Sequence, residues 1–354
     1  MSKIKAAVMG CTGLVGQQFV RLLDGHPYFE LAAITASGRS AGRPYGESMS
    51  WAGGGDGPGP AGTMIVRETN LEAVLAAGPR VVFSALPPAA AQPIEPALRE
   101  RGLRVFTNAS AHRLDADVPV LIPELNPGHL DLARRQLERS GGFIAANSNC
   151  STSGLAMALK PLQEFGIQDV TVTTFQSISG AGRRGLAAMD IAGNVIPLIR
   201  NEEEKMIRET KRILGRLDGP EVVPAPFEVR ATCCRVPVRE GHLMSVVVRF
   251  EREVSAASAK EALAGFRGLP QEAGLPTAPE RPLIVRDEED RPQPALDAWA
   301  GSPERARGMA VTNGRVRPAA GLLSFVLLVH NTVRGAAGTC VLAAELAVRE
   351  KLLA

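Results

Sequence analysis

The fold is decided by the stretch IKAAVMGCTGLVG, residues 4–16, near the start of a chain of 354 residues. Its apolar beginning, Ile4 to Val8, predicts a short buried strand, and the apolar residues that follow recur at helical spacing. Three glycines in the pattern G-x-x-G-x-x-G lie between strand and helix, a variant of the dinucleotide-binding fingerprint. Glycine lets the backbone turn tightly and approach a pyrophosphate, while the helix start offers N–H groups to the anion. A glycine-rich turn without a ligand is the alternative, but the position directly after the first strand favours cofactor binding.

The segments that follow alternate between strand and helix patterns up to about residue 150. This alternation predicts a parallel sheet with helices on both faces, and so a Rossmann-type α/β domain. The expected elements are strands at Leu31 to Thr35, Val81 to Leu86 and Arg104 to Thr107, and a helix at Ile94 to Arg101. A run rich in glycine and proline at residues 53–60 predicts a surface excursion.

Beyond about residue 150 the pattern becomes β-rich and closely spaced, which predicts an α+β domain with a mainly antiparallel sheet. Its expected strands are Val170 to Gln176, Val229 to Val238 and Leu243 to Arg249. The chain ends in a predicted helix, Ala336 to Ala354, for which Asn331 or Thr332 is the expected N-cap residue.

Composition gives no sign of a nucleic-acid or membrane partner. The 40 basic and 37 acidic residues leave a formal net charge of +3, so any anion site must be local. The longest apolar run, Ala319 to Val329, is shorter than the roughly 20 residues that a membrane-spanning helix needs. The five cysteines fit neither a disulfide framework nor a metal site, and the N-terminus has no signal-peptide pattern. We therefore expect free thiols, no bound metal and a cytoplasmic protein.

The end of the second expected strand decides which dinucleotide is bound. An NAD site usually has Asp or Glu about 20 residues beyond the glycines, where it binds a ribose hydroxyl. Here the sequence reads Thr35-Ala36-Ser37-Gly38-Arg39-Ser40, with Arg43 close behind, and the next acidic residue is Glu47. Hydroxyl and guanidinium groups suit a 2′-phosphate, so the sequence predicts NADP, with a solvated basic loop as the alternative.

One cysteine stands in a setting that favours chemistry. Cys150 lies between Asn147-Ser148-Asn149 and Ser151-Thr152-Ser153, and a helical pattern follows, so it is predicted at a helix N-terminus. The positive end of the helix dipole favours the reactive thiolate. Polar neighbours on both sides argue against the alternative of a buried structural thiol.

A nucleophilic thiol needs a partner that moves protons. His242 follows a glycine at an expected connection between two strands and is the leading candidate. His26 and His129 lie beside prolines and resemble loop residues, whereas the sequence does not dismiss His112 and His330. A Cys–His pair suits a cysteine hydrolase as well as a reductase, but a hydrolase has no use for a dinucleotide. A thiol beside a hydride donor predicts reduction of an activated acyl group to an aldehyde, or the reverse.

Several motifs together resemble those of aspartate-semialdehyde dehydrogenases, particularly the archaeal and fungal ones, over nearly the whole chain. The matching stretches are residues 10–16, 37–43, 149–152, 176–182, 194–197, 202–205, 235–238, 241–242 and 330–335. The resemblance implies a Rossmann-type domain of residues 1–149 plus 332–354, a catalytic and dimerisation domain of residues 150–331, and a homodimer or homotetramer. It also implies NADP-dependent, reversible reductive dephosphorylation of L-aspartyl 4-phosphate to L-aspartate 4-semialdehyde, on the pathway to lysine, threonine and methionine.

The same resemblance implies roles for individual residues. The implied catalytic residues are Cys150 as the nucleophile that carries the thioacyl group, His242 as the acid/base and Gln176 as an orienting residue. The substrate carries a carboxylate, an ammonium and a phosphate. Arg235 is the implied partner of the carboxylate, and Glu202 is that of the ammonium. The phosphate has three implied partners, which are Lys205, Arg113 and Asn149. The implied cofactor contacts are Gly10, Thr12, Gly13, Leu14, Val15, Ser37, Arg39, Ser40, Arg43, Ser84, Leu86, Ser179, Gly180, Gly182 and Asn331.

Departures and alternatives accompany this interpretation. Ser148 stands where the family usually has proline, Arg183-Arg184 where Tyr-Pro is common, and Leu243 where threonine is common. Taken without the resemblance, the charge run 202–205 is typical of a solvated helix face. A malonyl-CoA reductase shares the thiol chemistry but needs neither an ammonium partner nor a phosphate site. An inactive NADP-binding scaffold is the alternative from another class, and the intact set of catalytic residue types argues against it.

The predicted cofactor choice is directly testable. We expect kcat/KM with NADP to exceed kcat/KM with NAD by about tenfold or more, because Arg39 and Arg43 offer charge to a 2′-phosphate that NAD lacks. Steady-state rates with each dinucleotide at matched substrate concentration measure this ratio. A clear preference for NAD would contradict the prediction.

Overall fold

The N-terminal domain is built on six parallel strands in the order β3-β2-β1-β4-β5-β6. The computed structural model describes residues 2–54 and 57–353, so Gly55 and Asp56 of the predicted excursion lie outside the described residues. The strands are β1 (Ile4–Met9), β2 (Phe29–Ala36), β3 (Arg67–Glu68), β4 (Val81–Ser84), β5 (Arg104–Thr107) and β6 (Phe143–Ala146). This order is that of a doubly wound dinucleotide-binding sheet, which confirms the predicted Rossmann-type domain.

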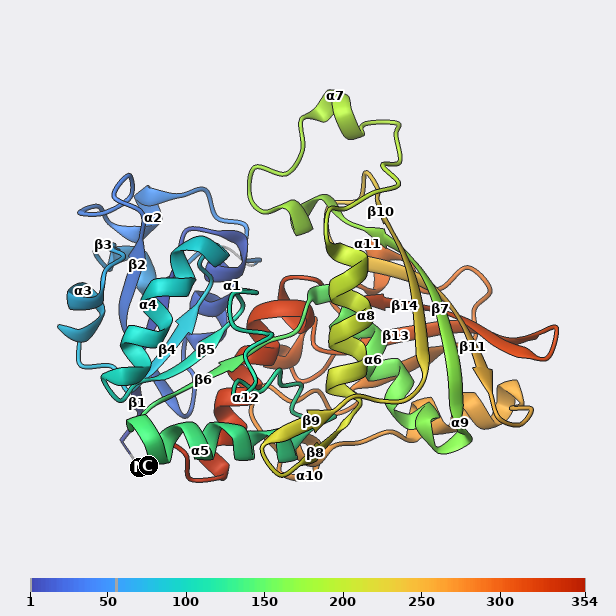
Figure 1. Ribbon diagram of the computed structural model, residues 1–354. Coiled ribbons are helices and arrows are strands. Elements are labelled where there is room, and N and C mark those ends of the chain that lie inside the picture. Colours follow the sequence, from blue (N-terminus) through green and yellow to red (C-terminus); the bar gives the residue numbers. More distant parts are fainter. Residues whose placement is uncertain (1, 55–56, 354) are drawn as a thin grey trace.

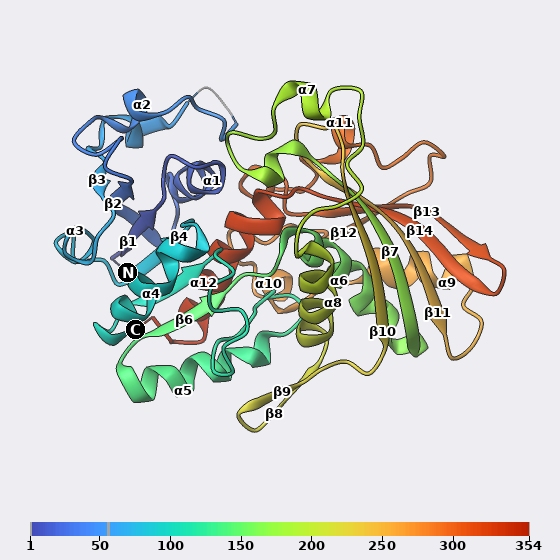
Figure 2. The same ribbon diagram turned by 45° about the horizontal axis from the view of Figure 1, so that its top comes forward.

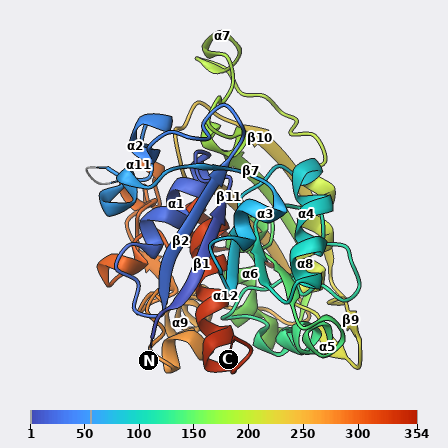
Figure 3. The ribbon, with the colours of Figure 1, turned by 90° about the vertical axis from the view of Figure 1, so that its left-hand side faces the viewer.

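Both faces of this sheet are covered, and the buried apolar residues of its central strands point alternately to the two sides. Val8, Phe83 and Phe106 belong to one core, packed with α1 (Leu14–Leu23) and α12 (Gly338–Arg349). Met9 and Val82 point to the opposite core. That second core packs against α3 (Leu71–Leu75) and α4 (Pro88–Glu100), and α1 and α4 lie on opposite sides of the sheet in Figure 3. The remaining helices of this domain are α2 (Tyr45–Ser48) and α5 (Leu130–Ser140).

The second domain contains one mixed sheet of six strands in the order β10-β7-β11-β14-β13-β12. Its strands are β7 (Ile167–Gln176), β10 (Glu228–Arg235), β11 (His242–Phe250), β12 (Leu283–Arg286), β13 (Val311–Ala319) and β14 (Leu322–Val329). The three inner pairs are antiparallel, as predicted, whereas the two outer pairs, β10 with β7 and β12 with β13, are parallel. The α+β prediction is therefore confirmed, with a sheet that is mixed.

Helices cover one face of this second sheet. Buried side chains of α6 (Cys150–Leu162), α8 (Glu202–Ile213) and α9 (Ala256–Gly265) share a core with the sheet. On the other face Thr171 is exposed and Val247 is half-buried, so no element of the described chain covers it fully. The smaller elements are α7 (Ala188–Ile191), α10 (Leu269–Glu272), α11 (Pro294–Asp297) and the hairpin of β8 (Arg216–Asp218) with β9 (Glu221–Val223). Helix α7 lies on a loop that projects from the body of the molecule (Figures 1 and 2).

Several predicted boundaries move. Helix α4 begins at Pro88 rather than at Ile94, because proline is tolerated in the first helical turn. The final helix begins at Gly338 after a π-helical turn, Val333–Ala337, and ends at Arg349. Thr332, one of the two predicted N-cap residues, is at the N-cap position of the π-helical turn, but it has helical backbone angles and its side chain makes no cap bond. Asn331 instead accepts a hydrogen bond from the backbone N–H of Gly241 at 3.0 Å.

A fully buried ion pair fixes the π-helical turn. The guanidinium of Arg334 donates two hydrogen bonds to the carboxylate of Glu124, at 3.0 and 2.6 Å, and a third to the carbonyl of Met309. Neither side chain of the pair is exposed.

No helix within residues 2–54 and 57–353 is long and apolar enough to cross a membrane. The same ranges contain no group of three or more His, Cys, Asp or Glu side chains placed to hold a metal ion.

Removal of Arg334 should destabilise the protein strongly. Arg334→Met leaves the Glu124 carboxylate buried without its cation, which typically costs about 3–5 kcal/mol. The thermal unfolding midpoint should therefore fall by many degrees. Arg134→Met is the matched control, because Arg134 pairs with Glu350 at the surface, where such a pair contributes about 0–1 kcal/mol. Equal midpoints for the two variants would contradict this account of the buried pair.

Candidate active site

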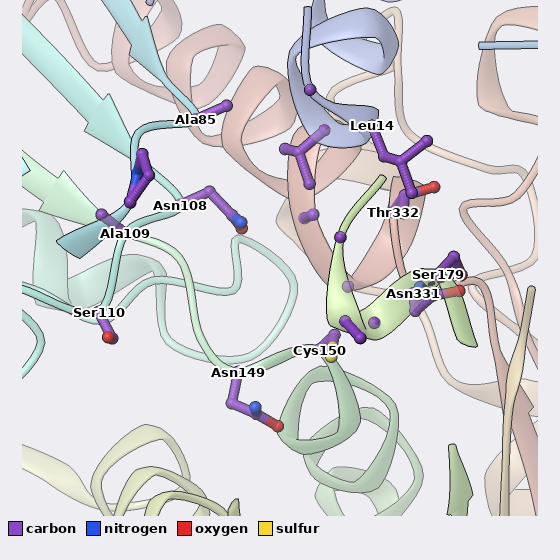
Figure 4. Close-up of a pocket in the computed structure, with 18 of the residues that line it drawn as sticks. Leu14, Ala85, Asn108, Ala109, Ser110, Asn149, Cys150, Ser179, Asn331 and Thr332 are labelled. Atoms are coloured by element: carbon purple, nitrogen blue, oxygen red, sulfur yellow. Dashed lines mark hydrogen bonds between the residues drawn. The ribbon is translucent and has the colours of Figure 1, made fainter. Parts of the chain in front are cut away.

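A cavity of about 500 Å³ opens between the two domains. Figure 4 shows residues that line it, among them Leu14, Ala85 and Cys150. One wall is the glycine loop at Gly13 with Leu14, together with the β4–α4 loop that begins at Ala85. The opposite wall is the start of α6 with Cys150 and the turn that contains Ser179. The predicted site residues that line it are Gly13, Leu14, Val15, Leu86, Arg113, Asn149, Cys150, Ser179, Gly180, Gly182, Lys205 and Asn331. The sequence therefore identified both walls.

The glycine loop has the shape that a pyrophosphate requires. A Cβ on Gly16 would lie 2.1 Å from the carbonyl oxygen of Gly10, and a Cβ on Gly10, whose φ is +77°, would lie 2.7 Å from that of Ala85. Helix α1 begins after Gly13 without a side-chain cap. Its first N–H groups therefore face the cavity without a capping side chain, as an anion site at a helix start needs.

Other predicted cofactor residues lie outside the cavity wall. Ser37, Arg39, Ser40 and Arg43 follow β2 on the loop toward α2, where Arg43 donates a hydrogen bond to the carbonyl of Glu47 at 2.9 Å. Gly10 and Thr12 belong to the loop itself, and Ser84 is fully buried as the last residue of β4. Contact with a dinucleotide at these positions stays a prediction.

Cys150 is the first residue of α6, as predicted. Asn149 is the N-cap residue, and its Oδ1 accepts hydrogen bonds from the N–H groups of Ser151 and Thr152 at 3.0 and 3.1 Å. Behind the cysteine lies Gly335 of the π-helical turn, where a Cβ would come within 2.7 Å of the Cβ of Cys150. Only glycine leaves room for the cysteine at this contact.

The sequence predicted that the helix start favours a thiolate, but the surroundings of Cys150 act in the opposite direction. Desolvation of the sulfur and, to a smaller extent, the carboxylate of Glu202 raise the pKa of Cys150 to about 12. Arg113 and Arg235 act in the opposite direction, but their effect on the pKa is smaller. The helix start alone does not ionise this sulfur, because α6 receives buried carboxylates at its positive end as well as the thiol.

His242 is the first residue of β11 and is fully buried. Its Nδ1 accepts a hydrogen bond from the backbone N–H of Ser177 at 3.0 Å. A backbone N–H only donates, so the neutral ring carries its hydrogen on Nε2. Burial lowers the pKa of His242 to about 3, with Arg235 and His330 contributing, which keeps the ring neutral. Its Nε2 has no hydrogen-bond partner in the described part of the chain and is therefore a free donor.

Gly180 lies in the turn that contains Ser179, between the cavity and the predicted substrate residues. A Cβ at this position would lie 2.6 Å from Nη1 of Arg235 and 3.2 Å from Nε2 of His242. Arg235 is buried, ends β10 and donates to the carbonyl of Ser177 at 2.7 Å. Gln176 is also buried, and its amide donates to Thr174 at 3.2 Å. These side chains lie behind the turn of Gly180 rather than on the cavity wall.

Helix α8 places three charged residues on one face at helical spacing. Glu202 is buried and accepts a hydrogen bond from Nδ2 of Asn149 at 2.7 Å, while Lys205 lines the cavity. The solvated-face interpretation is thus wrong for Glu202 and correct for Glu204. Glu209, which sequence reasoning missed, pairs with Arg113 at 3.1 Å. Its spacing of seven residues from Glu202 was the available signal, because it repeats the same helix face.

The remaining histidines have structural partners. His26 lies in the loop between α1 and β2, as predicted, and is buried against Glu345 at 2.9 Å. His129 is buried with Asn126 at 3.0 Å, and His112 contacts Asp115 at 2.9 Å. His330 is packed edge-on against a tryptophan. His242 is thus the histidine beside the predicted substrate residue Arg235.

Two family models match the chain: the semialdehyde dehydrogenase NAD binding domain over residues 5–133 and the semialdehyde dehydrogenase dimerisation domain over residues 159–334. The aspartate-semialdehyde dehydrogenase of Methanothermobacter thermautotrophicus is 47% identical, with 97% of this chain and 98% of the relative covered. The malonyl-CoA reductase (NADP) of Metallosphaera sedula is 39% identical, with 98% and 97% covered. A crystal structure of aspartate-semialdehyde dehydrogenase with NADP from Candida albicans has a TM-score of 0.88 at 38% identity, with 99% of this chain and 100% of that chain covered.

These matches confirm the resemblance found in the motifs and both parts of the predicted fold. They extend over both domains, and they include an archaeal and a fungal relative. The chain therefore belongs to the semialdehyde dehydrogenase family, in the branch of the archaeal and fungal aspartate-semialdehyde dehydrogenases.

Proposed function

We propose that this chain catalyses the NADP-dependent, reversible conversion of L-aspartyl 4-phosphate into L-aspartate 4-semialdehyde and phosphate. One observation carries the proposal: Cys150 lies at the start of α6, in the cavity between the glycine loop and a set of charged side chains. A cavity that presents a thiol beside a dinucleotide cradle suits acyl transfer to sulfur followed by reduction. The relatives from Methanothermobacter and Candida carry the name of this activity.

The charges of the site match those of this substrate. Arg235 would bind the α-carboxylate and Glu202 the ammonium, while Lys205 and Arg113 would bind the phosphate with the side chain of Asn149. A guanidinium is suited to bidentate binding of a carboxylate. All five side chains converge on the start of α6: Lys205, Arg113 and Asn149 line the cavity, and Glu202 and Arg235 influence the pKa of Cys150.

NADP would bind along the glycine loop and supply a hydride at the turn of Ser179 to Gly182. The loops that end β2 and β4 would hold the rest of the dinucleotide. We propose that its contacts are Gly10, Thr12, Gly13, Leu14, Val15, Ser37, Arg39, Ser40, Arg43, Ser84, Leu86, Ser179, Gly180, Gly182 and Asn331. The uncapped start of α1 and the close approach of Gly10 to Gly16 support this assignment.

In the proposed reaction the sulfur of Cys150 attacks the acyl carbon and displaces phosphate. The high pKa of the thiol means that its proton must leave as the bond forms, and the departing phosphate is basic enough to take it. The ammonium of the substrate would neutralise Glu202, the carboxylate that raises the pKa of this thiol. After reduction, the C–S bond breaks, the aldehyde leaves and the sulfur regains a proton from solvent. Gln176 would orient the acyl group.

His242, for which the resemblance implies an acid/base role, would act toward the thiol as an N–H donor rather than as a base. Its Nε2–H is the hydrogen that the Ser177 contact leaves free, so the ring cannot take the thiol proton at that atom. A buried N–H with no partner is suited to stabilise the oxyanion that forms when the carbonyl is attacked. The imidazole would then serve the same role in both directions of the reaction.

Malonyl-CoA reduction is the second candidate, because the relative from Metallosphaera has that name at 39% identity. Glu202, Lys205 and Arg113 favour the aminoacyl phosphate, since a malonyl thioester has neither an ammonium nor an acyl phosphate group.

We further propose a division of the chain into two domains, residues 1–149 plus 332–354 and residues 150–331, because α12 packs in the first core. The dimerisation-domain match and the partly uncovered face of the second sheet support a homodimer or homotetramer. The proposed location is the cytoplasm, where free cysteines such as those of this chain are usual.

The substrate assay decides between these activities. We expect NADP reduction that depends on both aspartate semialdehyde and inorganic phosphate, and no comparable oxidation of NADPH by malonyl-CoA. Cys150→Ala should abolish turnover, because no other group in the site forms the thioester, while NADP binding measured by fluorescence titration stays unchanged. Turnover by Cys150→Ala would refute the mechanism, and faster reaction with malonyl-CoA would reverse the choice of substrate.

The raised pKa of Cys150 gives a second expected outcome. Iodoacetamide reacts with thiolate, so the rate of alkylation should rise about tenfold per pH unit from about pH 7 to about pH 10 without reaching a plateau. Mass spectrometry of the Cys150 peptide follows the modification separately from that of the other cysteines. A plateau near neutral pH would show that the free enzyme already holds a thiolate.

A further inference from the structure

Glu209 is a buried carboxylate to which the motifs and the proposed roles assign nothing. It lies on α8, is only 4% exposed, and faces the start of α6. One carboxylate oxygen pairs with Nη1 of Arg113 at 3.1 Å. The other accepts a hydrogen bond from the backbone N–H of Asn149 at 2.5 Å. A single side chain thus holds a predicted phosphate ligand and the residue next to the nucleophile.

Both groups that Glu209 holds are restrained from other sides as well. Nη2 of Arg113 donates to the carbonyl of Asn108 at 2.9 Å, so the guanidinium is fixed at two points. The side chain of Asn149 is held by Glu202 through Nδ2 and by the first N–H groups of α6 through Oδ1. Among the residues that the structure describes, Glu209 alone bonds both the backbone of Asn149 and the guanidinium of Arg113. The distance between the phosphate site and Cys150 therefore depends on this carboxylate.

We propose that Glu209 is a positioning residue that sets the phosphate-binding guanidinium of Arg113 against the sulfur of Cys150. This rests on the proposed function, in which Arg113 binds the phosphate that Cys150 displaces. A carboxylate beside a phosphate site repels the anion, so its presence there has a cost in phosphate affinity. The positioning role explains why the carboxylate of Glu209 nevertheless lies beside Arg113, which must itself bind the phosphate anion.

Glu209 as a mere nearby charge and Glu209 as a positioning residue predict opposite changes in phosphate affinity for the neutral variant Glu209→Gln. If Glu209 were only a nearby charge, its loss would strengthen phosphate binding. If Glu209 is a positioning residue, its replacement frees Arg113. The amide N–H₂ of glutamine then faces either the guanidinium of Arg113 or the backbone N–H of Asn149, both of which are donors. Phosphate binding therefore weakens. We expect the KM for inorganic phosphate in the oxidative direction to rise by about tenfold to a hundredfold, as for a lost hydrogen bond to a charged group. The KM values for aspartate semialdehyde and NADP should change less than about twofold.

Glu204→Gln is the matched control, because Glu204 is exposed on the same helix and should leave all three KM values unchanged. Glu209→Asp is the second variant should Glu209→Gln fail to fold, and it should shift the phosphate KM in the same direction by a smaller factor. A direct measurement is the protection of Cys150 from iodoacetamide by inorganic phosphate in the NADP-loaded protein. Protection should need a proportionally higher phosphate concentration in Glu209→Gln.

The failures of the two proposals are distinguishable. A wild-type protein that does not oxidise aspartate semialdehyde with phosphate would refute the proposed function before any variant is measured. An active wild type whose Glu209→Gln variant has an unchanged or lower phosphate KM would overturn the role of Glu209 alone. A parallel rise of all three KM values would also overturn it, because a general loss of structure does not single out phosphate.

Discussion

The structure depends on the buried contact between the π-helical turn, residues 333–337, and the start of α6. Arg334 fixes this turn through its ion pair with Glu124 and its bond to the carbonyl of Met309. The carbonyl of Arg334 accepts hydrogen bonds from Ser153 of α6 and Thr339 of α12. One residue therefore connects the helix that carries the nucleophile, the helix that completes the first core and two intervening segments. Cys150 packs directly against Gly335 of the same turn.

The electrostatics of the site explain why the pKa of the thiol is raised. A helix start favours anions, but here α6 faces two carboxylates of α8 as well as the thiol, and burial adds its own penalty. A protonated sulfur is protected from oxidation and from unwanted acylation, because the thiolate is the reactive form. In the proposed reaction, the change of protonation would occur when the ammonium of the substrate meets Glu202.

The parts of the site predicted from sequence are those carried by local patterns. The glycine loop and the place of Cys150 at a helix start follow from spacing alone, as does the order of strands and helices in the first domain. Arg235, Glu202 and Lys205 came from the family resemblance, because a charge run on a helix does not reveal which of its members is buried. Their contacts with the site are between elements far apart in the sequence.

Three features could not be predicted because they depend on distances through space. The tautomer of His242 is set by a backbone N–H of Ser177, 65 positions away in the sequence. The bond between Glu209 and the backbone of Asn149 requires α8 to lie against α6, and the pKa of Cys150 depends on the groups that surround the sulfur. The sequence shows the dipole of the helix, which favours a thiolate, but not the desolvation that opposes it.

Gly180 has a consequence for how this protein changes in evolution. Its bare backbone lies on the wall assigned to the nicotinamide and, on its other side, within a methyl group's reach of both Arg235 and His242. A mutation there that adjusts the fit of the dinucleotide would displace Arg235 and His242, the side chains proposed to act on the acyl substrate. Under the proposed roles, the preference for the dinucleotide and the preference for the acyl substrate both depend on this residue and cannot change independently there.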